Sequence, residues 1–533
     1  MKIKALIWIK ILLIFICILS CDVLDEDPFV QTDTENYYLN EEDAIDGLTS
    51  AYARLKSGNG YYKQKFLSTL FAASDQGLAT FEFNNFKNGT VTSTDPNTQL
   101  IWKDIYLAIR EANNVIANVP TIDMNDELKF RILGEAKFLR ALHYFNLVRC
   151  FGEVPLRLQP VEATEAEQGL PVSSIVDIYS NIIEDLQYAA NNCWDRNESR
   201  NGNINNLGRA TKASSNALLA KVYLRMGSCK RTAQSGNEGN TKYLALPGSV
   251  SYYYQLAKAH CDTSLNDNGF NLSSNLENWI SNFDADNGNN PEMLFDVQGS
   301  DEIGQGTAVS NLFTPRNSGL SGTGFGGTNK LKPRFINFHL NKNDPRFQNS
   351  ILRNYQNTNW EYSINNGSTG YIPTSLITGN TANWRLWQVW TAKYIDTNAT
   401  TPYTSRQNWH VIRLADVYLM RAEALAEIFQ DPEMASNDIN SLRNRVGMSA
   451  FNGSGMTMDT FRNLLLKERA VELYMEGHRF FDLTRFGVYN EYCSNVLGAT
   501  SSQYVQGAIG SRQPEDYTWP IPVSETSSNS NIN

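Results

Sequence analysis

DELKFRILGEAKFLRALHYFNLVRCF, from Asp126 to Phe151, carries apolar residues on two faces of a predicted helix. A helix with two apolar faces packs between neighbouring helices instead of lying on the surface of a core. Gly152 and Pro155 follow it, and both residue types end helices. One apolar stripe consists of Leu128, Ile132, Ala136 and Leu139, and the other consists of Phe138, Leu142 and Phe145.

Seven other segments show helical spacing of their apolar residues. The first begins at Asn40, whose side chain can cap a helix, and the acids that follow it suit the positive helix end. Helix pairs joined by short turns are typical of a tetratricopeptide-like array, so we expect an all-α fold, an αα-superhelix. The seven segments are residues 40–55, 100–118, 173–189, 208–227, 252–265, 409–429 and 459–476.

The helical pattern fades between residues 266 and 408, where Gly, Asn, Ser and Thr increase. Within this region only 292–298 is predicted as a buried strand, so the strands should be few and short. Long loops on a rigid scaffold are where function usually lies. We therefore expect a helical region at 40–265, a loop-rich ligand-binding elaboration at 266–408 and a second helical region at 409–533.

The N-terminus predicts export and lipidation. Residues 1–20 carry three lysines and no acid, then the apolar run 11–19, which is too short to span a membrane. The sequence Ile18-Leu-Ser-Cys21 resembles a bacterial lipoprotein box, so Cys21 is the predicted lipidation site. Residues 21–39 would then form the lipid anchor and a leash that holds the protein on a membrane. The alternative is an ordinary cleaved signal with a chance cysteine.

Charge argues against a nucleic-acid partner. The chain has a net charge of −10, and removal of the signal with its three lysines brings the mature chain to about −13. An acidic protein without a Lys/Arg-rich run binds nucleic acid poorly. The remaining cysteines are odd in number and form no C-x-x-C, so we interpret most as small buried hydrophobes, with a pairing among Cys193, Cys229 and Cys261 left open. These cysteines are Cys150, Cys193, Cys229, Cys261 and Cys493.

No catalytic or cofactor motif stands out. The five histidines have no zinc-ligand spacing, and neither a nucleophile elbow nor a phosphate-binding P-loop is present. The segment 322–327, GTGFGG, matches G-x-G-x-x-G, but it follows no predicted strand and opens no helix, so we interpret it as a loop. We therefore expect no cofactor and no resident metal.

Glu468, Glu472 and Glu476 are the candidate catalytic carboxylates. Their spacing places them on one face of the predicted helix 459–476, and paired carboxylates could hydrolyse a glycoside. Basic residues are interleaved nearby, including Arg469 and Arg479. Mixed charges on one element more often form a salt-bridged structural network, which is the interpretation we favour.

A second candidate is the segment 284–288, DADNG, which resembles part of a calcium-binding loop. It has Gly288 where an oxygen ligand is needed and Asn289 where the loop needs glycine. We therefore assign no metal to it.

Aromatic residues beside amides in the loops are the candidate ligand-binding residues. An aromatic ring covers the apolar C–H face of a sugar, and Asn side chains bond its hydroxyls. The alternative is that these rings belong to the core, which we favour for the closely spaced Trp384, Trp387 and Trp390. The candidates are Phe81, Phe83, Asn84, Phe86, Phe325, Trp360, Tyr362 and Trp384.

Several motifs together resemble the SusD-like (RagB/SusD) family of nutrient-binding outer-membrane lipoproteins, and the likeness covers nearly the whole mature chain. The tail SETSSNSNIN departs from the Asn-Pro and Gln-Asn-Pro-Gly-Tyr patterns frequent in that family. The matching segments are EAKFLRALHYFNLVR at 135–149, FGEVPL at 151–156, GRATKA at 208–213, RLADVYLMRAEA at 413–424, LRNRVG at 442–447, the residues Glu468, Arg469, Glu472, Glu476, Arg479 and Asp482, and PIP at 520–522.

The resemblance implies four tetratricopeptide-like helix pairs with a loop-rich second half, and it implies that the hallmark carboxylates are structural. It further implies a non-catalytic surface protein that captures oligo- or polysaccharide and delivers it to a SusC-like TonB-dependent transporter. Two alternatives remain open at this point. One is a glycoside hydrolase on a helical scaffold, and the other is a tetratricopeptide scaffold for a protein or peptide partner.

Overall fold

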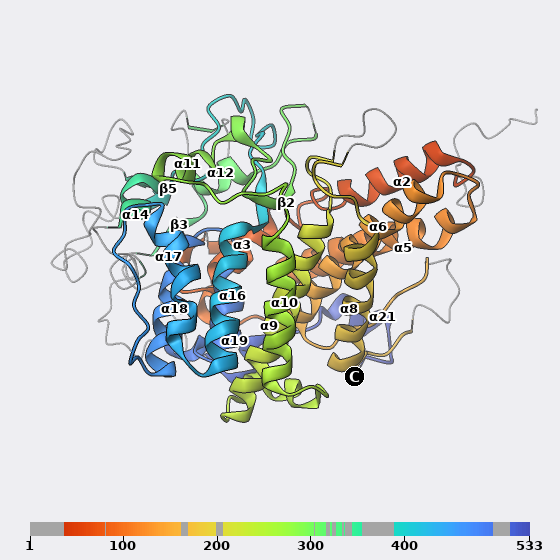
Figure 1. The fold of residues 1–533 in the computed structure, drawn as a ribbon. Helices are drawn as coiled ribbons and strands as arrows, with labels where there is room; N and C mark the ends of the chain where they lie inside the picture. The colour runs from red at the N-terminus through yellow and green to blue at the C-terminus, as the bar shows by residue number, and fades with distance from the viewer. Residues whose placement is uncertain are drawn as a thin grey trace, which may run out of the picture.

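The computed structural model describes residues 37–79, 81–160, 169–198, 206–302, 304–315, 320–321, 327–332, 335, 344–353, 389–493 and 512–532. Helices dominate this part of the chain (Figure 1). They are α2 (Glu41–Ala53), α3 (Lys65–Ala73), α4 (Asn84–Asn88), α5 (Pro96–Asn118), α6 (Asp126–Phe151), α8 (Ile175–Asn192), α9 (Lys212–Gln234), α10 (Val250–Leu265), α11 (Leu276–Ser281), α12 (Val309–Phe313), α14 (Pro345–Ser350), α16 (Leu414–Phe429), α17 (Ser436–Asn444), α18 (Met458–Glu472), α19 (Arg479–Phe486), α20 (Tyr489–Cys493) and α21 (Val523–Ser528).

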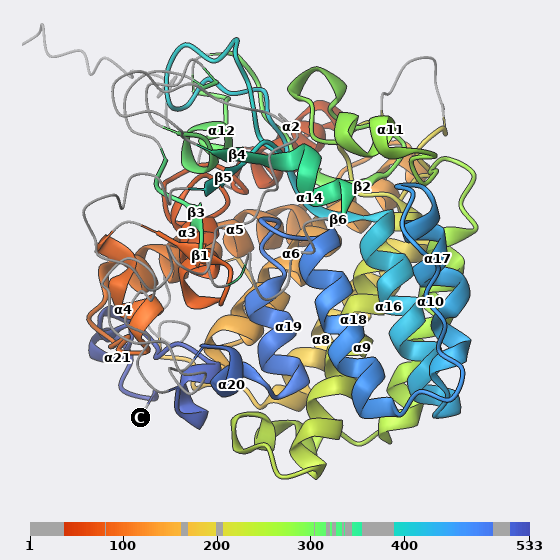
Figure 2. The ribbon, with the colours of Figure 1, turned by 90° about the vertical axis from the view of Figure 1, so that its left-hand side faces the viewer.

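The long helices form a continuous array in which each packs against the next. The order of contact is α5, α6, α8, α9, α10, α16 and then α17 and α18, while α19 returns to pack on α9 and α3 (Figure 2). This arrangement confirms the predicted all-α, tetratricopeptide-like fold. No helix in the described part of the chain is long and apolar enough to cross a membrane.

The two-faced helix has the predicted position. Helix α6 spans Asp126–Phe151, contacts α5 on one side and α8 on the other, and is buried over most of its length. Gly152, at a φ of 75°, ends it in a backbone conformation that glycine adopts without strain. Helix α9 is buried in the same way, and the small residue Gly227 lies where α10 comes close.

The strands are few and short, as predicted. Strand β2 (Met293–Val297) pairs antiparallel with β6 (Trp409–Arg413) and is buried at every residue, which confirms the predicted strand at 292–298. The other pairs are β1 (Gly77–Leu78) with β3 (Lys330–Leu331) and β4 (Ile351–Arg353) with β5 (Val389–Thr391). With α11, α12 and α14, these strands gather across one end of the helical array (Figure 1).

Three predicted helix boundaries were wrong. The helix predicted at 208–227 does not end at Gly227, because α9 continues to Gln234. Residues 409–413, predicted as helix, form strand β6, because Trp409 and Ile412 pair with the buried β2 and favour extended backbone. Helix α16 begins only at Leu414. Helix α18 ends at Glu472, and Met475 at φ 63° and Gly477 at φ 78° turn the chain away. Glu476 therefore lies beyond the helix that was predicted to carry it.

Prediction: Gly227→Leu should lower the free energy of unfolding by about 1–3 kcal/mol, because the site between α9 and α10 has no room for a side chain. A Cβ at Gly227 would already lie 3.3 Å from the Cβ of Tyr253. Urea unfolding measures the change, with Gln255→Leu on the exposed face of α10 as the control, expected to change stability by less than about 0.5 kcal/mol. Equal stability of both variants would contradict close packing here.

Candidate functional site

The candidate carboxylates meet in a buried ion cluster centred on Arg413, at the junction of β6 and α16. Arg413 Nη1 donates to Glu472 Oε1 and to Glu292 Oε1, both at 2.8 Å. Its Nε donates to Glu476 Oε2 at 2.7 Å. We call this group the Arg413 cluster. Its members are the carboxylates of Asp344, Glu292, Glu468, Glu472 and Glu476 and the cations of Arg346, Arg413, Arg443, Arg445 and Lys393.

Both carboxylate oxygens of Glu472 take further partners. Arg445 Nη2 donates to Glu472 Oε1 at 2.6 Å, and Arg346 Nη1 donates to Glu472 Oε2 at 2.9 Å. Trp279 Nε1 adds a bond of 2.9 Å to Glu472. Glu472 is completely buried, and Glu476 is 2% exposed. The interpretation of these carboxylates as a structural network is therefore confirmed.

The charge state of the cluster does not suit acid catalysis. Burial opposes ionisation of Glu472, but Arg445, Arg413 and Arg346 outweigh it and hold its pKa well below the usual range. In the same way burial is outweighed at Glu476 by Arg413 and Lys393, which lower its pKa to about 2. A general acid for glycoside hydrolysis needs a raised pKa. These two glutamates stay ionised and paired instead.

Two of the candidate ligand-binding aromatics are core residues. Phe83 and Phe86 are each 1% exposed, and the ring of Phe86 meets the indole of Trp519 edge-on at 5.2 Å. Lys65 covers the Phe83 ring at 5.3 Å. Neither ring presents a face on which a sugar could stack, so their prediction as ligand-binding residues is corrected. They are buried because α3, α4 and the C-terminal segment close over them.

The other candidates are not brought together in the described part of the chain. Asn84 begins α4 and is half-buried. Phe81 belongs to a 3₁₀ turn at Phe81–Phe83, but its side chain lies outside the described part. The candidates Phe325, Trp360, Tyr362 and Trp384 also lie outside the described residues.

The structure also shows the surroundings of three other features that the sequence analysis singled out, namely Trp390, the segment 284–288 and the cysteines. Trp390 lies in β5 at 1% exposure, as expected for a core residue, although in a strand. In the calcium-like segment, Asp284 accepts from the backbone N–H of Asp286, and Asp286 pairs with Arg406. Among the described residues, no three His, Cys, Asp or Glu side chains are grouped to hold a metal ion.

The cysteines at 150, 193, 229, 261 and 493 are free and buried, which confirms their role as small hydrophobes.

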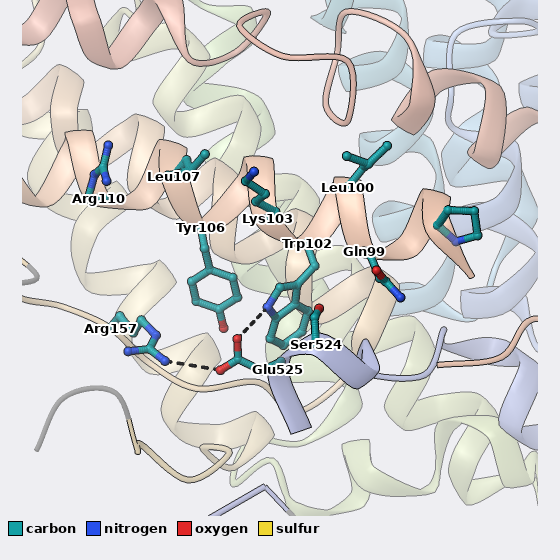
Figure 3. A pocket seen from close by; sticks show the side chains of 11 residues that line it. Gln99, Leu100, Trp102, Lys103, Tyr106, Leu107, Arg110, Arg157, Ser524 and Glu525 are labelled. Carbon is teal, nitrogen blue, oxygen red and sulfur yellow. Dashed lines mark hydrogen bonds and ion pairs between the residues drawn. The ribbon is translucent and has the colours of Figure 1, made fainter. Parts of the chain in front are cut away.

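A groove lies along the outer face of α5, with the C-terminal segment as its second wall (Figure 3). Trp102 Nε1 donates to Glu525 Oε2 at 3.2 Å, and Arg157 pairs with Glu525 Oε1 at 3.3 Å. The first contact holds α21 against α5, and the second holds it against the segment that follows α6. Further along, Asn529 donates to the carbonyl of Leu170 at 2.7 Å, and Asn531 donates to that of Gly169. The atypical tail is therefore docked on the helical array.

The groove has a volume of about 800 Å³ and mixes rings, apolar side chains and charges. Tyr106 is half-buried and donates its hydroxyl to the carbonyl of Pro155 at 2.8 Å, which fixes the ring. Burial raises the pKa of this phenol, and the nearby Tyr144 and Glu525 act in the same direction. We call this site the α5 groove. Its lining residues are Pro96, Gln99, Leu100, Trp102, Lys103, Tyr106, Leu107, Arg110, Arg157, Ser524 and Glu525.

Sequence reasoning missed this groove and the cationic partners of the cluster. The groove needs α5 and residues more than 400 positions later in the sequence, and no periodicity indicates that contact. One signal was available on α5, where Leu100 and Leu107 share a face with Lys103 and mix apolar with basic residues. Several arginines of the Arg413 cluster lie in the segments 413–424 and 442–447, which matched family motifs. No sequence pattern indicated that these arginines pair with the carboxylates.

Two family models match this chain over adjoining parts of its length. One, described as the SusD family, matches residues 223–533, and another, described as starch-binding associating with outer membrane, matches residues 22–224. The chain belongs to the SusD family. The resemblance inferred from the sequence motifs is therefore confirmed.

Individual relatives cover nearly the whole chain. SusD-like protein P25 of Formosa agariphila is 26% identical, over 92% of this chain and 90% of its own length. The starch-binding protein SusD of Bacteroides thetaiotaomicron is 25% identical, over 92% of this chain and 88% of its own. A solved laminarin-binding SusD-like protein is 26% identical, with a TM-score of 0.67 over 93% of this chain and 99% of its own. This SusD-family chain thus has relatives that are named for binding glucans.

Prediction: Glu472→Gln should lower the free energy of unfolding by about 3–5 kcal/mol, because it removes an anionic partner that the buried guanidiniums of Arg346, Arg413 and Arg445 share and leaves the cluster with uncompensated positive charge. Urea unfolding of the 22–533 protein measures the loss. Glu302→Gln, at an exposed position, is the control and should stay within about 0.5 kcal/mol of the parent. A Glu472→Gln protein of parental stability would show that the cluster adds nothing to the fold.

Prediction: stability should fall in acid as Glu476 and Glu472 take up protons. The pKa of Glu476 is about 2 in the folded chain against an ordinary value of 4.5, so the unfolded chain binds more protons between these values. The contribution of Glu476 is fully present above about pH 4.5 and is lost as the pH falls toward about 2. In denaturant titrations from pH 6 to 3, Glu476→Gln should give a shallower decline of the unfolding free energy. An unchanged slope would place the acid sensitivity elsewhere.

Proposed function

We propose that this protein is a non-catalytic cell-surface lipoprotein that captures oligo- or polysaccharide and passes it to a SusC-like TonB-dependent transporter. The observation that carries the proposal is the family match across 22–533, together with full-length relatives named for binding starch and laminarin. A rigid helical array that presents loops at one end suits the capture of a ligand without chemical change.

The buried cluster supports a role in binding and not in catalysis. Catalysis at Glu468, Glu472 or Glu476 would need a carboxylate that can reach substrate and exchange a proton. These three side chains are at most 5% exposed, and each pairs with an arginine. The hydrolase alternative therefore loses the carboxylates on which it rested.

The proposed sugar-binding residues lie in the loops. After the correction of Phe83 and Phe86, the candidates are Phe81, Asn84, Phe325, Trp360, Tyr362 and Trp384. A single stacked aromatic in a binding site contributes about 1–3 kcal/mol through buried apolar area and ring contacts.

The proposed attachment is through Cys21. Lipid on this residue and the leash at 21–39 would hold the helical array at the outer membrane. The description of the family model as associating with the outer membrane supports this location. Attachment there would place the captured sugar beside a transporter in the same membrane.

Prediction: the soluble form 22–533 should bind at least one neutral glucan in a panel that includes starch and laminarin, as measured by affinity electrophoresis. Trp360→Ala should weaken that binding about five- to 150-fold, which corresponds to about 1–3 kcal/mol. Tyr252→Ala, which removes a 51% exposed aromatic on α10, is the control and should leave binding unchanged.

Three results would contradict the proposal. Binding to no polysaccharide, together with tight binding to a peptide, would favour the scaffold alternative. Release of reducing sugar by the purified protein would favour hydrolysis. Failure of the lipidated protein to co-purify with a barrel transporter from its own membrane would remove the proposed delivery step.

A further inference from the structure

We propose that the α5 groove is a second carbohydrate site, and that it binds an anionic oligosaccharide, a chain of sugar rings that carry carboxylate or sulfate groups. The class of ligand, a carbohydrate, rests on the proposed function. The charge of the ligand and the place where it binds rest on the groove itself. None of the groove's lining residues is among the loop residues proposed above.

The charge of the groove is opposite to that of the chain. Its lining contains the cations of Lys103, Arg110 and Arg157 and a single carboxylate, that of Glu525, in a chain of net charge −10. Glu525 is engaged by Arg157 and by the indole of Trp102. A cationic strip on an acidic protein attracts anions, so it favours anionic ligands over neutral ones.

Two of these cations are available for a ligand. Lys103 is exposed, and its ammonium group makes no ion pair within the described part of the chain. Arg110 is 42% exposed at its side chain, and its partner Glu111 at 3.0 Å also holds Arg54 at 2.9 Å. One carboxylate shared by two guanidiniums leaves positive charge uncompensated. Figure 3 shows Lys103 and Arg110 along α5, above the ring of Tyr106.

The uncharged part of the lining suits a sugar ring. Leu100 is 38% exposed, and Leu107 and Tyr106 are half-buried beside it. Apolar and aromatic surfaces of this kind cover the C–H faces of pyranose rings. The Gln99 amide can donate to and accept from hydroxyls, and the Glu525 carboxylate can accept from them. A simple inorganic anion would leave these apolar groups unused.

The dimensions favour a chain of sugars over a single ring. The lining residues of α5 run from Pro96 to Arg110, which is about 21 Å along a helix. The volume of about 800 Å³ lies within the range of roughly 300–1,000 Å³ for small-molecule sites. Lys103 and Arg110 are two helical turns apart, so they can meet charges on different sugar rings of one chain.

The test compares ligands that differ only in charge. Binding of oligogalacturonate to the 22–533 protein is measured by calorimetry against its methyl ester, which has the same rings without the carboxylates. A sulfated galactan oligosaccharide shows whether sulfate replaces carboxylate. We expect the acid to bind on the order of tenfold more tightly than the ester, with affinity falling as salt rises.

The variants Lys103→Gln and Arg110→Gln should each weaken binding of the acid several-fold and leave laminarin binding unchanged. Lys467→Gln, at an exposed lysine on α18, is the matched control and should change neither. Trp360→Ala should weaken laminarin binding and leave the anionic sugar unaffected. This crossed pattern separates failure of the groove from failure of the proposed function.

The assignment is overturned if the acid and its ester bind equally, or if Lys103→Gln and Arg110→Gln leave binding of the acid unchanged. It is also overturned if neither anionic sugar binds while laminarin does, in which case the proposed function stands alone. A peptide of residues 22–36, with six acids and no base, is a third probe. Binding of this peptide and of no anionic sugar would assign the groove to the leash instead.

Discussion

The burial of the Arg413 guanidinium is the constraint on which the rest of the structure depends. A guanidinium at 0% exposure is tolerated only when its hydrogen bonds and its charge are fully met, because desolvation of an ion costs several kcal/mol. Glu292, Glu472 and Glu476 meet that requirement here, and they come from the residue before β2, from the end of α18 and from the turn after it. The junction of β6 and α16 must therefore assemble together with residues that lie 59 to 121 positions away in the sequence.

The same cluster explains how a loop-rich half is held on a helical array. Arg346 and Lys393 come from segments near α14 and β5, and both reach the end of α18. The cation of Lys393 also lies over the ring of Tyr474 at 4.1 Å. The described segments of 266–408 are thus held on the array by charge-assisted bonds as well as by buried apolar side chains such as Phe313, Phe347 and Tyr394.

Local pattern was enough to predict the long helices, but shorter ones such as α3, α17 and α19 were missed. It did not give every boundary, and it gave no long-range contact. The double stripe of 126–151 predicted α6 as buried, because periodicity reports directly which faces meet neighbours. The helix prediction for residues 409–413 was wrong because WHVIR, which precedes LADVYLMRAEA, contains enough apolar residues to continue a helical pattern. Only the pairing with β2 selects the strand. The prediction that Phe83 and Phe86 bind ligand was wrong for a related reason. An aromatic residue beside an asparagine looks the same in sequence whether a distant indole, here Trp519, covers it or not. The α5 groove could not be predicted, because no local sequence pattern indicates that Glu525 lies near Tyr106.

The docked tail has a consequence for the order in which the molecule can form. Asn529 and Ile532 are 1% and 6% exposed, and Asn529 bonds to the chain at Leu170. The segment 523–532 therefore completes a wall against helix α5, which lies about 400 residues earlier in the sequence. This wall can form only after residues 523–532 have been synthesised, so the α5 groove is among the last features of the fold to be completed.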